Sequence, residues 1–108
     1  MGQLSILVVD DEPDLRSTLS HALNRSGYSV EGAANGVDAL EKFKTANFNL
    51  VISDVKMPQM SGMELLTSIK KMSPQTPVIM ISAFGTVSNA VAAMQQGASD
   101  YILEPFSF

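Results

Sequence analysis

Short apolar runs alternate along this chain with segments in which apolar residues recur at every third or fourth position. Continuous aliphatic runs are typical of strands buried on both faces of a sheet, and the spaced stripes are typical of amphipathic helices. The runs predict strands at residues 5–9, 28–33, 50–54, 77–82 and 100–103. The stripes predict helices between these strands, beginning near Pro13, Val37, Met63 and Val87.

This order of elements favours a single α/β domain over residues 1–108. Strands that alternate with helices form a parallel sheet with helices on both faces, because right-handed crossovers must return over the sheet. Gly27 and Gly97 are placed to end the first and fourth helices. The chain stops where a fifth helix would begin, so we expect a domain truncated before that helix.

Composition narrows the class of protein. The apolar content of 45% is enough for a core, and the net charge of −4 argues against non-specific binding to nucleic acid or to a membrane surface. The chain has no cysteine, which excludes disulfides and thiolate metal sites. It shows neither a signal peptide nor an apolar stretch of membrane length, so a cytoplasmic location is expected.

Polar residues gather where the predicted strands end. Asp10 and Asp11 follow the first strand, Asp54 ends the third, Ser82 ends the fourth and Glu104 follows the fifth. In an open parallel sheet, ligands bind outside the carboxyl ends of the strands. If the strand order is 2-1-3-4-5, the first and third strands are neighbours, and Asp10, Asp11 and Asp54 would share one small pocket.

Each of these residues also has an ordinary structural explanation. Asp10 or Asp11 would cap the helix that begins near Pro13. Asp54 would accept hydrogen bonds from loop amides, and Ser82 would be a simple hydroxyl at a strand end. All of these explanations must hold at once for the cluster to be accidental, so a shared function is favoured.

The clustered carboxylates predict a cation site. Without a partner they would repel one another and raise each other's pKa. Mg²⁺ prefers oxygen ligands and binds through one or two carboxylates while keeping several waters. Beside such an ion, a carboxylate can attack phosphorus and form an aspartyl phosphate. A hydroxyl such as that of Ser82 could then donate to a phosphoryl oxygen and shift the loop after its strand.

Short motifs extend over nearly the whole chain, from about Leu4 to Phe106. They are Val8-Val9-Asp10-Asp11-Glu12, Ser53-Asp54-Val55-Lys56-Met57-Pro58, Ser61-Gly62, Ile81-Ser82-Ala83, and Gly97-Ala98-Ser99-Asp100-Tyr101 before Pro105-Phe106. In this order and at these intervals they resemble the CheY-like receiver domain of two-component response regulators. The resemblance implies a flavodoxin-like, doubly wound five-stranded fold with strand order 2-1-3-4-5.

The resemblance also implies a role for individual residues. Asp54 would be the phosphoacceptor, and Ser82 would be the switch hydroxyl. Tyr101 would be the aromatic that turns inward when Ser82 moves, although an ordinary edge-strand aromatic is the alternative. The Mg²⁺ ligands would be Asp10, Asp11, Asp54 and the backbone carbonyl of Lys56.

The same resemblance implies partners. The phosphodonor of the family is a phosphohistidine on a sensor histidine kinase, and the receiver catalyses its own phosphorylation and dephosphorylation as a regulatory domain, not as a stand-alone metabolic enzyme. Residues 85–98 are similar to receivers of NtrC-type transcription activators. That likeness implies an N-terminal regulatory domain followed by ATPase and DNA-binding domains that this chain lacks. A homodimer stays open as a further partner, and we expect no direct contact of this domain with nucleic acid or membrane.

Glu104 departs from the family pattern, in which a lysine precedes the final Pro-Phe. The change reverses a charge beside the predicted pocket. Two functions therefore stay open. The first is a phosphorylation-dependent switch that works in weakened form, because Asp10, Asp11, Asp54 and Ser82 are retained. The second is a phosphate-independent module for protein interaction or dimerisation.

Two other chemistries on related folds fit less well. A flavin-binding electron carrier requires a Ser/Thr-rich phosphate loop after the first strand, and Glu12-Pro13-Asp14 there would repel a phosphate. A haloacid-type phosphatase requires two Asp residues separated by one position, and Asp10 and Asp11 are adjacent.

Overall fold

The apolar runs form the strands of one parallel sheet in the computed structural model, which describes residues 4–55, 57, 60–82 and 87–103, without the side chains of 87–90 and 103. The strands are β1 (Ser5–Val9), β2 (Ser29–Ala33), β3 (Leu50–Asp54), β4 (Val78–Ser82) and β5 (Asp100–Leu103). The helices are α1 (Pro13–Arg25), α2 (Gly36–Thr45), α3 (Gly62–Met72) and α4 (Val87–Gln95). The sheet order is β2-β1-β3-β4-β5, which confirms the predicted 2-1-3-4-5 topology.

Two predicted strands begin one residue late, for reasons of hydrogen bonding. The N–H of Tyr28 donates to the carbonyl of Leu23 at 3.2 Å and so completes the end of α1 instead of opening β2. Pro77 has no N–H to donate to a neighbouring strand, and β4 begins at Val78. The predicted helix stops at Gly27 and Gly97 are confirmed, because both adopt positive φ values, of 99° and 105°.

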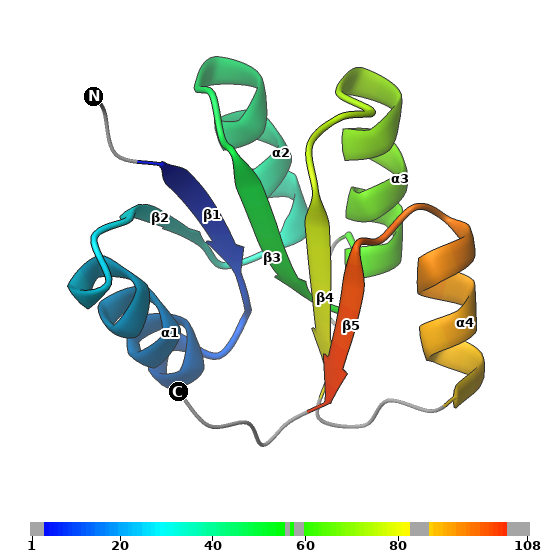
Figure 1. Ribbon diagram of the computed structural model, residues 1–108, viewed down its shortest axis with the longest axis horizontal. Helices are drawn as coiled ribbons and strands as arrows, with labels where there is room; N and C mark the ends of the chain where they lie inside the picture. Colours follow the sequence, from blue (N-terminus) through cyan, green and yellow to red (C-terminus); the bar gives the residue numbers. More distant parts are fainter. Residues whose placement is uncertain (1–3, 56, 58–59, 83–86, 104–108) are drawn as a thin grey trace.

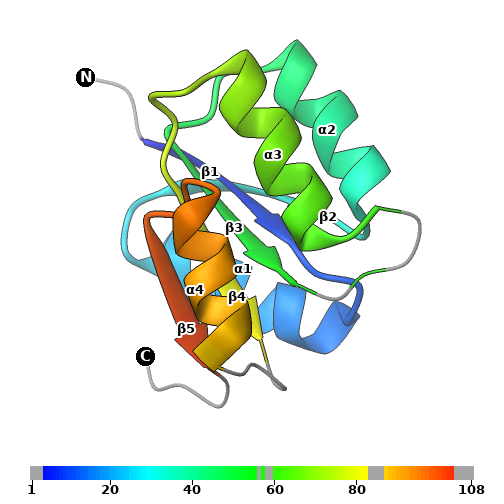
Figure 2. The ribbon, with the colours of Figure 1, turned by 90° about the vertical axis from the view of Figure 1, so that its right-hand side faces the viewer.

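Helices cover both faces of the sheet, with α1 on one side and α2, α3 and α4 on the other (Figures 1 and 2). The inner strand β1 is buried on both faces: Ile6 and Val8 pack towards α1, and Leu7 and Val9 pack towards α2 and α3. The core on the three-helix face also includes fully buried residues of β3, α3 and β4, namely Val51, Leu65, Leu66, Ile69, Val78 and Met80. This packing holds the ends of β1 and β3 side by side.

Helix ends are organised by local caps. The side chain of Asn35 accepts a hydrogen bond from the N–H of Asp38 at the start of α2, at 2.8 Å. Ser61 and Glu64 form a reciprocal capping box at the start of α3. Glu12, at the start of α1, makes no such side-chain bond. None of the helices in the described ranges has the length and apolar character needed to cross a membrane.

Candidate functional site

Three carboxylates meet at the carboxyl ends of β1 and β3. Val9 and Ser53 are partners in the parallel pairing of these strands, so Asp10 and Asp54 follow at the same level. Oxygen atoms of Asp10, Asp11 and Asp54 all lie within 4.8 Å of one another. The predicted meeting of these three carboxylates is therefore confirmed, and it joins residues more than 40 positions apart in the chain.

Asp10 is the buried member of the cluster, with a side chain only 1% exposed. Its Oδ1 accepts a hydrogen bond from the N–H of Glu12 at 2.9 Å. Asp10 thus organises its own turn and does not cap the helix, because the N-cap position of α1 is Glu12. Asp10 Oδ2 is buried and has no hydrogen-bond partner in the described part of the chain. An unpartnered buried oxygen is costly unless a donor or a cation satisfies it.

Burial raises the pKa of the Asp10 carboxyl above its ordinary value. The N–H of Glu12 opposes this rise in pKa, because it donates to the carboxylate. The negative charges of Asp11 and Glu12 raise the pKa further, and the positive charge of Arg16 lowers it. Asp10 is therefore held in a place that disfavours its charge, which is the condition that a bound cation would relieve.

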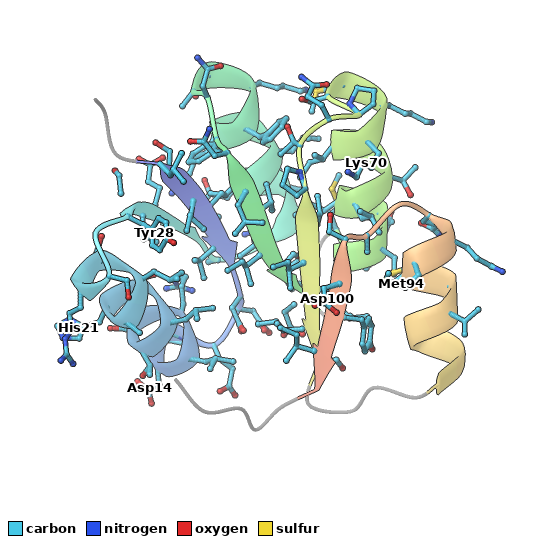
Figure 3. All side chains as sticks on the ribbon, in the orientation of Figure 1. Asp14, His21, Tyr28, Lys70, Met94 and Asp100 are labelled. Carbon is cyan, nitrogen blue, oxygen red and sulfur yellow. The ribbon has the colours of Figure 1, made fainter. Side chains whose placement is uncertain are left out.

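The oxygen donors suit a hard divalent cation such as Mg²⁺. Asp10 Oδ2 offers an inward oxygen without a partner among the described residues, Asp54 is half-buried and Asp11 is exposed. The chain has no cysteine, and its only histidine, His21, projects from the outer side of α1 (Figure 3). The donor set therefore fits Mg²⁺ better than a metal that prefers sulfur or imidazole.

The chain after Asp54 is held against the strand end. The N–H of Val55 donates to the carbonyl of Ile81 at 3.0 Å, and the N–H of Gly62 donates to the carbonyl of Val55 at 2.8 Å. A Cβ at Gly62 would lie 2.0 Å from the carbonyl oxygen of Asp54. Only glycine fits this contact. The sequence marked Gly62 as part of a turn or motif, but gave no signal for its contact with Asp54.

Ser82 and Tyr101 lie on the next two strands. Asp54 pairs with Ile81, so Ser82 stands one residue beyond that pair at the end of β4, with a side chain 4% exposed. Tyr101 pairs with Met80, and its half-buried ring packs against the core under α2, α3 and α4. Its hydroxyl is buried without a hydrogen-bond partner among the residues described.

Two of the predicted site residues, Lys56 and Glu104, lie outside the described residues. One basic residue near the cluster was missed at the level of sequence. Arg16, on α1, donates from Nη1 to the carbonyl of Asp10 at 2.7 Å. A basic residue one turn into the helix that follows the acidic pair was the available signal.

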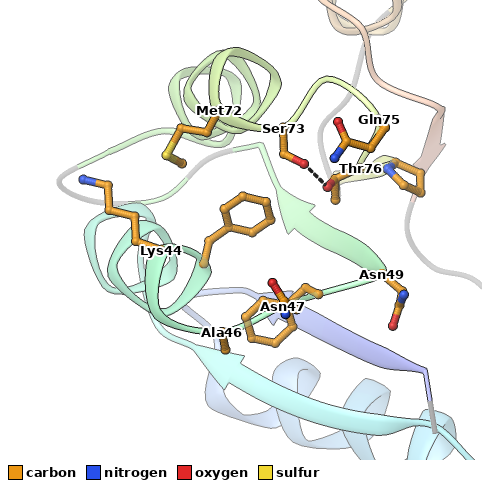
Figure 4. A pocket seen from close by; sticks show the side chains of 11 residues that line it. Lys44, Ala46, Asn47, Asn49, Met72, Ser73, Gln75 and Thr76 are labelled. Carbon is orange, nitrogen blue, oxygen red and sulfur yellow. Dashed lines mark hydrogen bonds between the residues drawn. The ribbon is translucent and has the colours of Figure 1, made fainter. Parts of the chain in front are cut away.

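A hollow of about 540 Å³ lies at the opposite end of the sheet, beside the amino ends of β3 and β4 (Figure 4). The stacked rings of Phe43 and Phe48, with centroids 6.4 Å apart, form part of its wall. The hydroxyls of Ser73 and Thr76 bond to each other at 2.7 Å. Lys44 is the one charged residue among those that line it. This hollow is therefore separate from the cluster of Asp10, Asp11 and Asp54, which lies at the carboxyl ends of the strands.

The sequence is similar to a known protein family and to curated proteins. The sequence matches the response regulator receiver domain family over residues 6–108. It is 42% identical to the transcriptional regulatory protein ZraR of Klebsiella oxytoca over 98% of this chain, and 41% identical to the transcriptional regulatory protein GlrR of Escherichia coli K12 over 93% of it. The matches span 24% and 22% of those two proteins, so the chain covers about a quarter of their length.

The fold also matches the solved structure of a response regulator. The response regulator protein TrrA of Thermotoga maritima, in complex with Mg²⁺-BeF, superposes with a TM-score of 0.89 at 36% identity. The match covers 98% of this chain and 90% of that one.

Proposed function

Because the chain belongs to the family of response regulator receiver domains and is similar to NtrC-type regulators, we propose that phosphorylation of Asp54, assisted by Mg²⁺, drives it as a signalling switch. The observation that carries this proposal is the cluster of Asp10, Asp11 and Asp54, whose oxygens lie within 4.8 Å at adjacent strand ends. The buried Oδ2 of Asp10, which has no partner among the described residues, supports a cation at the same place.

Each group of the cluster would have a defined role in this switch. Asp10, Asp11 and Asp54, with the backbone carbonyl of Lys56, would hold Mg²⁺, which supplies positive charge beside the incoming phosphoryl oxygens. An oxygen of Asp54 forms a bond to phosphorus while the bond from phosphorus to the imidazole nitrogen of the donor breaks. The electron pair of that bond stays on the nitrogen. Placement and charge neutralisation are the main contributions of the domain.

Ser82 would respond to the phosphorylation of Asp54. Its buried position at the end of β4, one residue beyond the partner of Asp54, supports a hydrogen bond from its hydroxyl to a phosphoryl oxygen. Making that bond would shift the end of β4. Tyr101 on β5 pairs with Met80, which lies on the same strand as Ser82. The ring of Tyr101 would therefore respond to a shift of β4.

Glu104 would weaken this chemistry without abolishing it. A carboxylate in place of the family's lysine removes a positive charge from the phosphoryl group and adds a negative one. The retained residues Asp10, Asp11, Asp54 and Ser82 still supply the metal site, the acceptor and the switch hydroxyl. The same substitution favours the second candidate function, a phosphate-independent interaction module.

Incubation with acetyl phosphate and Mg²⁺, followed by intact mass measurement, tests the proposal. We expect a gain of one phosphoryl group that needs Mg²⁺ and is absent in Asp54→Asn. Asp14→Asn is the matched control, because Asp14 is an exposed Asp in the first turn of α1 and outside the cluster. A wild-type protein that gains no mass, even at long times, contradicts the switch.

A second measurement separates the two candidate functions. Beryllofluoride binding, followed by NMR in the presence of Mg²⁺, should be stronger in Glu104→Lys than in the wild type. If neither protein binds the mimic and both self-associate equally with or without it, the interaction module is the better description.

The wider setting belongs to the same proposal. A sensor histidine kinase in the cytoplasm would be the phosphodonor, and ATPase and DNA-binding domains would receive the signal in a protein of the length of ZraR or GlrR. The names of these two relatives, both transcriptional regulatory proteins, support a role in transcription regulation.

A further inference from the structure

Arg16 reaches back from the first turns of α1 to the turn that carries Asp10 and Asp11. Its Nη1 donates to the carbonyl of Asp10 at 2.7 Å. Its own backbone N–H donates to the carbonyl of Glu12 at 3.0 Å. One residue therefore bonds to the carbonyl groups at both ends of the turn, and a guanidinium donor gives the side-chain bond a charge-assisted character.

The other residues of the turn form different hydrogen bonds. The N-cap residue Glu12 makes no side-chain bond to the first amides of α1. The N–H of Asp10 is tied to Ala33 on β2, at 3.1 Å, and Oδ1 of Asp10 is tied to the N–H of Glu12. The bond from Arg16 thus joins the body of α1 to the acidic turn through a side chain.

The absence of a side chain at Gly32 leaves room for the side chain of Arg16. A Cβ at Gly32 would lie 3.2 Å from Cδ of Arg16, so the aliphatic stem passes directly over β2 at that point. Arg16 is half-buried as a result. The stem is confined by the strand below it, which fixes where the guanidinium can point.

We propose that Arg16 is a positioning residue that holds the Asp10–Asp11 turn in the geometry that binds Mg²⁺. This inference deepens the proposed function and rests on it. The guanidinium bonds to a backbone carbonyl and not to a carboxylate, so the carboxylate oxygens stay available to the ion. Arg16 acts through the turn and does not itself touch the metal or the phosphoryl group.

The test compares Mg²⁺ affinity, measured by isothermal titration calorimetry, in three variants of the full chain. Arg16→Met keeps an apolar stem and loses the donors, and we expect it to bind Mg²⁺ about 10-fold more weakly, as for other residues that orient metal ligands. Arg16→Lys keeps a charge and a shorter donor, and should lose less. Arg25→Met removes the same charge from the far end of α1 and should leave the affinity unchanged.

The direction of the change separates positioning from plain electrostatics. Loss of a nearby positive charge alone would strengthen the binding of a cation. If Arg16→Met binds Mg²⁺ as tightly as the wild type, or more tightly, the positioning role is wrong.

A metal-free measurement keeps this inference distinct from the proposed function. Amide hydrogen exchange at Glu12, read by NMR without divalent ions, should quicken in Arg16→Met and stay unchanged in Arg25→Met. Unchanged exchange in Arg16→Met overturns the inference whether or not Mg²⁺ binds. A wild-type protein that binds no Mg²⁺, but whose Glu12 amide responds to the variant, would instead contradict the metal-assisted function and the metal-binding part of this inference.

Discussion

Asp10 shows at the scale of one residue how a candidate functional site can oppose stability. Its carboxylate is almost fully buried, and one of its oxygens has no partner among the described residues. Burying an ionised group without compensation destabilises the folded state. The metal-free protein should therefore carry a penalty in its free energy of unfolding that the cation removes.

Asp10→Asn should raise the free energy of unfolding at neutral pH without divalent ions, by about 1 kcal/mol. An amide oxygen can still accept the bond from the N–H of Glu12, and the buried charge is gone. Urea denaturation with EDTA present is the measurement. Asp14→Asn is the control for net charge, and a loss of stability in Asp10→Asn would contradict the account.

The pH dependence of stability follows from the direction of the Asp10 pKa. Burial raises this pKa in the folded protein, so the folded state binds the proton more tightly than the unfolded state does. The contribution of Asp10 to stability is fully present below its unfolded pKa, and it is lost as pH rises through the raised folded pKa. Metal-free urea denaturation from acid to neutral pH should show this loss in the wild type, and the same series should be flatter in Asp10→Asn.

Gly62→Ala should destabilise the fold by about 3 kcal/mol, because the new Cβ would collide with the carbonyl of Asp54. Gly27→Ala is the matched variant. Gly27 has a positive φ but nothing within 4 Å of an added Cβ, so strain alone should cost about 1 kcal/mol. Equal losses of unfolding free energy in chemical denaturation would show that the contact with Asp54 is unimportant.

At the scale of elements, the helices that flank the site begin in different ways. α2 and α3 have side-chain caps at Asn35 and Ser61, which follow directly from the sequence. α1 begins at Pro13, and its N-cap residue Glu12 makes no side-chain bond; the bond from Arg16 to Asp10 ties its first turns to the strand end instead. The helix that follows the acidic turn is thus bonded to that turn by one of its own side chains.

Ser61→Ala should cost about 1 kcal/mol of stability, because it removes the hydroxyl that accepts from the N–H of Glu64. Ser17→Ala makes the same chemical change at an exposed position inside α1 and should be close to neutral. Thermal unfolding of both variants measures the difference. If the two melt together, the capping box does not contribute.

At the scale of the whole molecule, the sheet brings separate parts of the chain to one edge. β1 and β3 are neighbours in space although α1, β2 and α2 separate them in sequence, and this adjacency creates the acidic cluster (Figure 1). A ligand that binds only the folded state stabilises the whole domain. Mg²⁺ binding should therefore be visible in global unfolding.

Mg²⁺ at about 100 times its dissociation constant should stabilise the wild type by about 2.7 kcal/mol. For a domain of this size, that corresponds to a rise in Tm of about 10 °C or more. Asp11→Asn removes a carboxylate of the cluster and should lose most of the shift, whereas Asp14→Asn should keep it. An equal shift in both variants, measured by differential scanning calorimetry, would place the ion elsewhere.

Local patterns in the chain were sufficient for much of this description. The strand runs, the helix stripes and the stops at Gly27 and Gly97 depend on neighbours a few residues away, and their predicted positions agree with the structure to within a residue at β2 and β4. The meeting of Asp10 with Asp54 was also predictable, because the carboxyl ends of adjacent parallel strands share one edge.

Contacts between distant segments needed the folded coordinates. No local pattern shows that Gly62 must lie against the carbonyl of Asp54, or that Gly32 makes room for Arg16. The raised pKa of Asp10 likewise depends on what the assembled sheet excludes from water. Periodicity and turn chemistry act over a few residues along the chain, whereas burial, close approach and electrostatic environment arise only when strands and helices have packed.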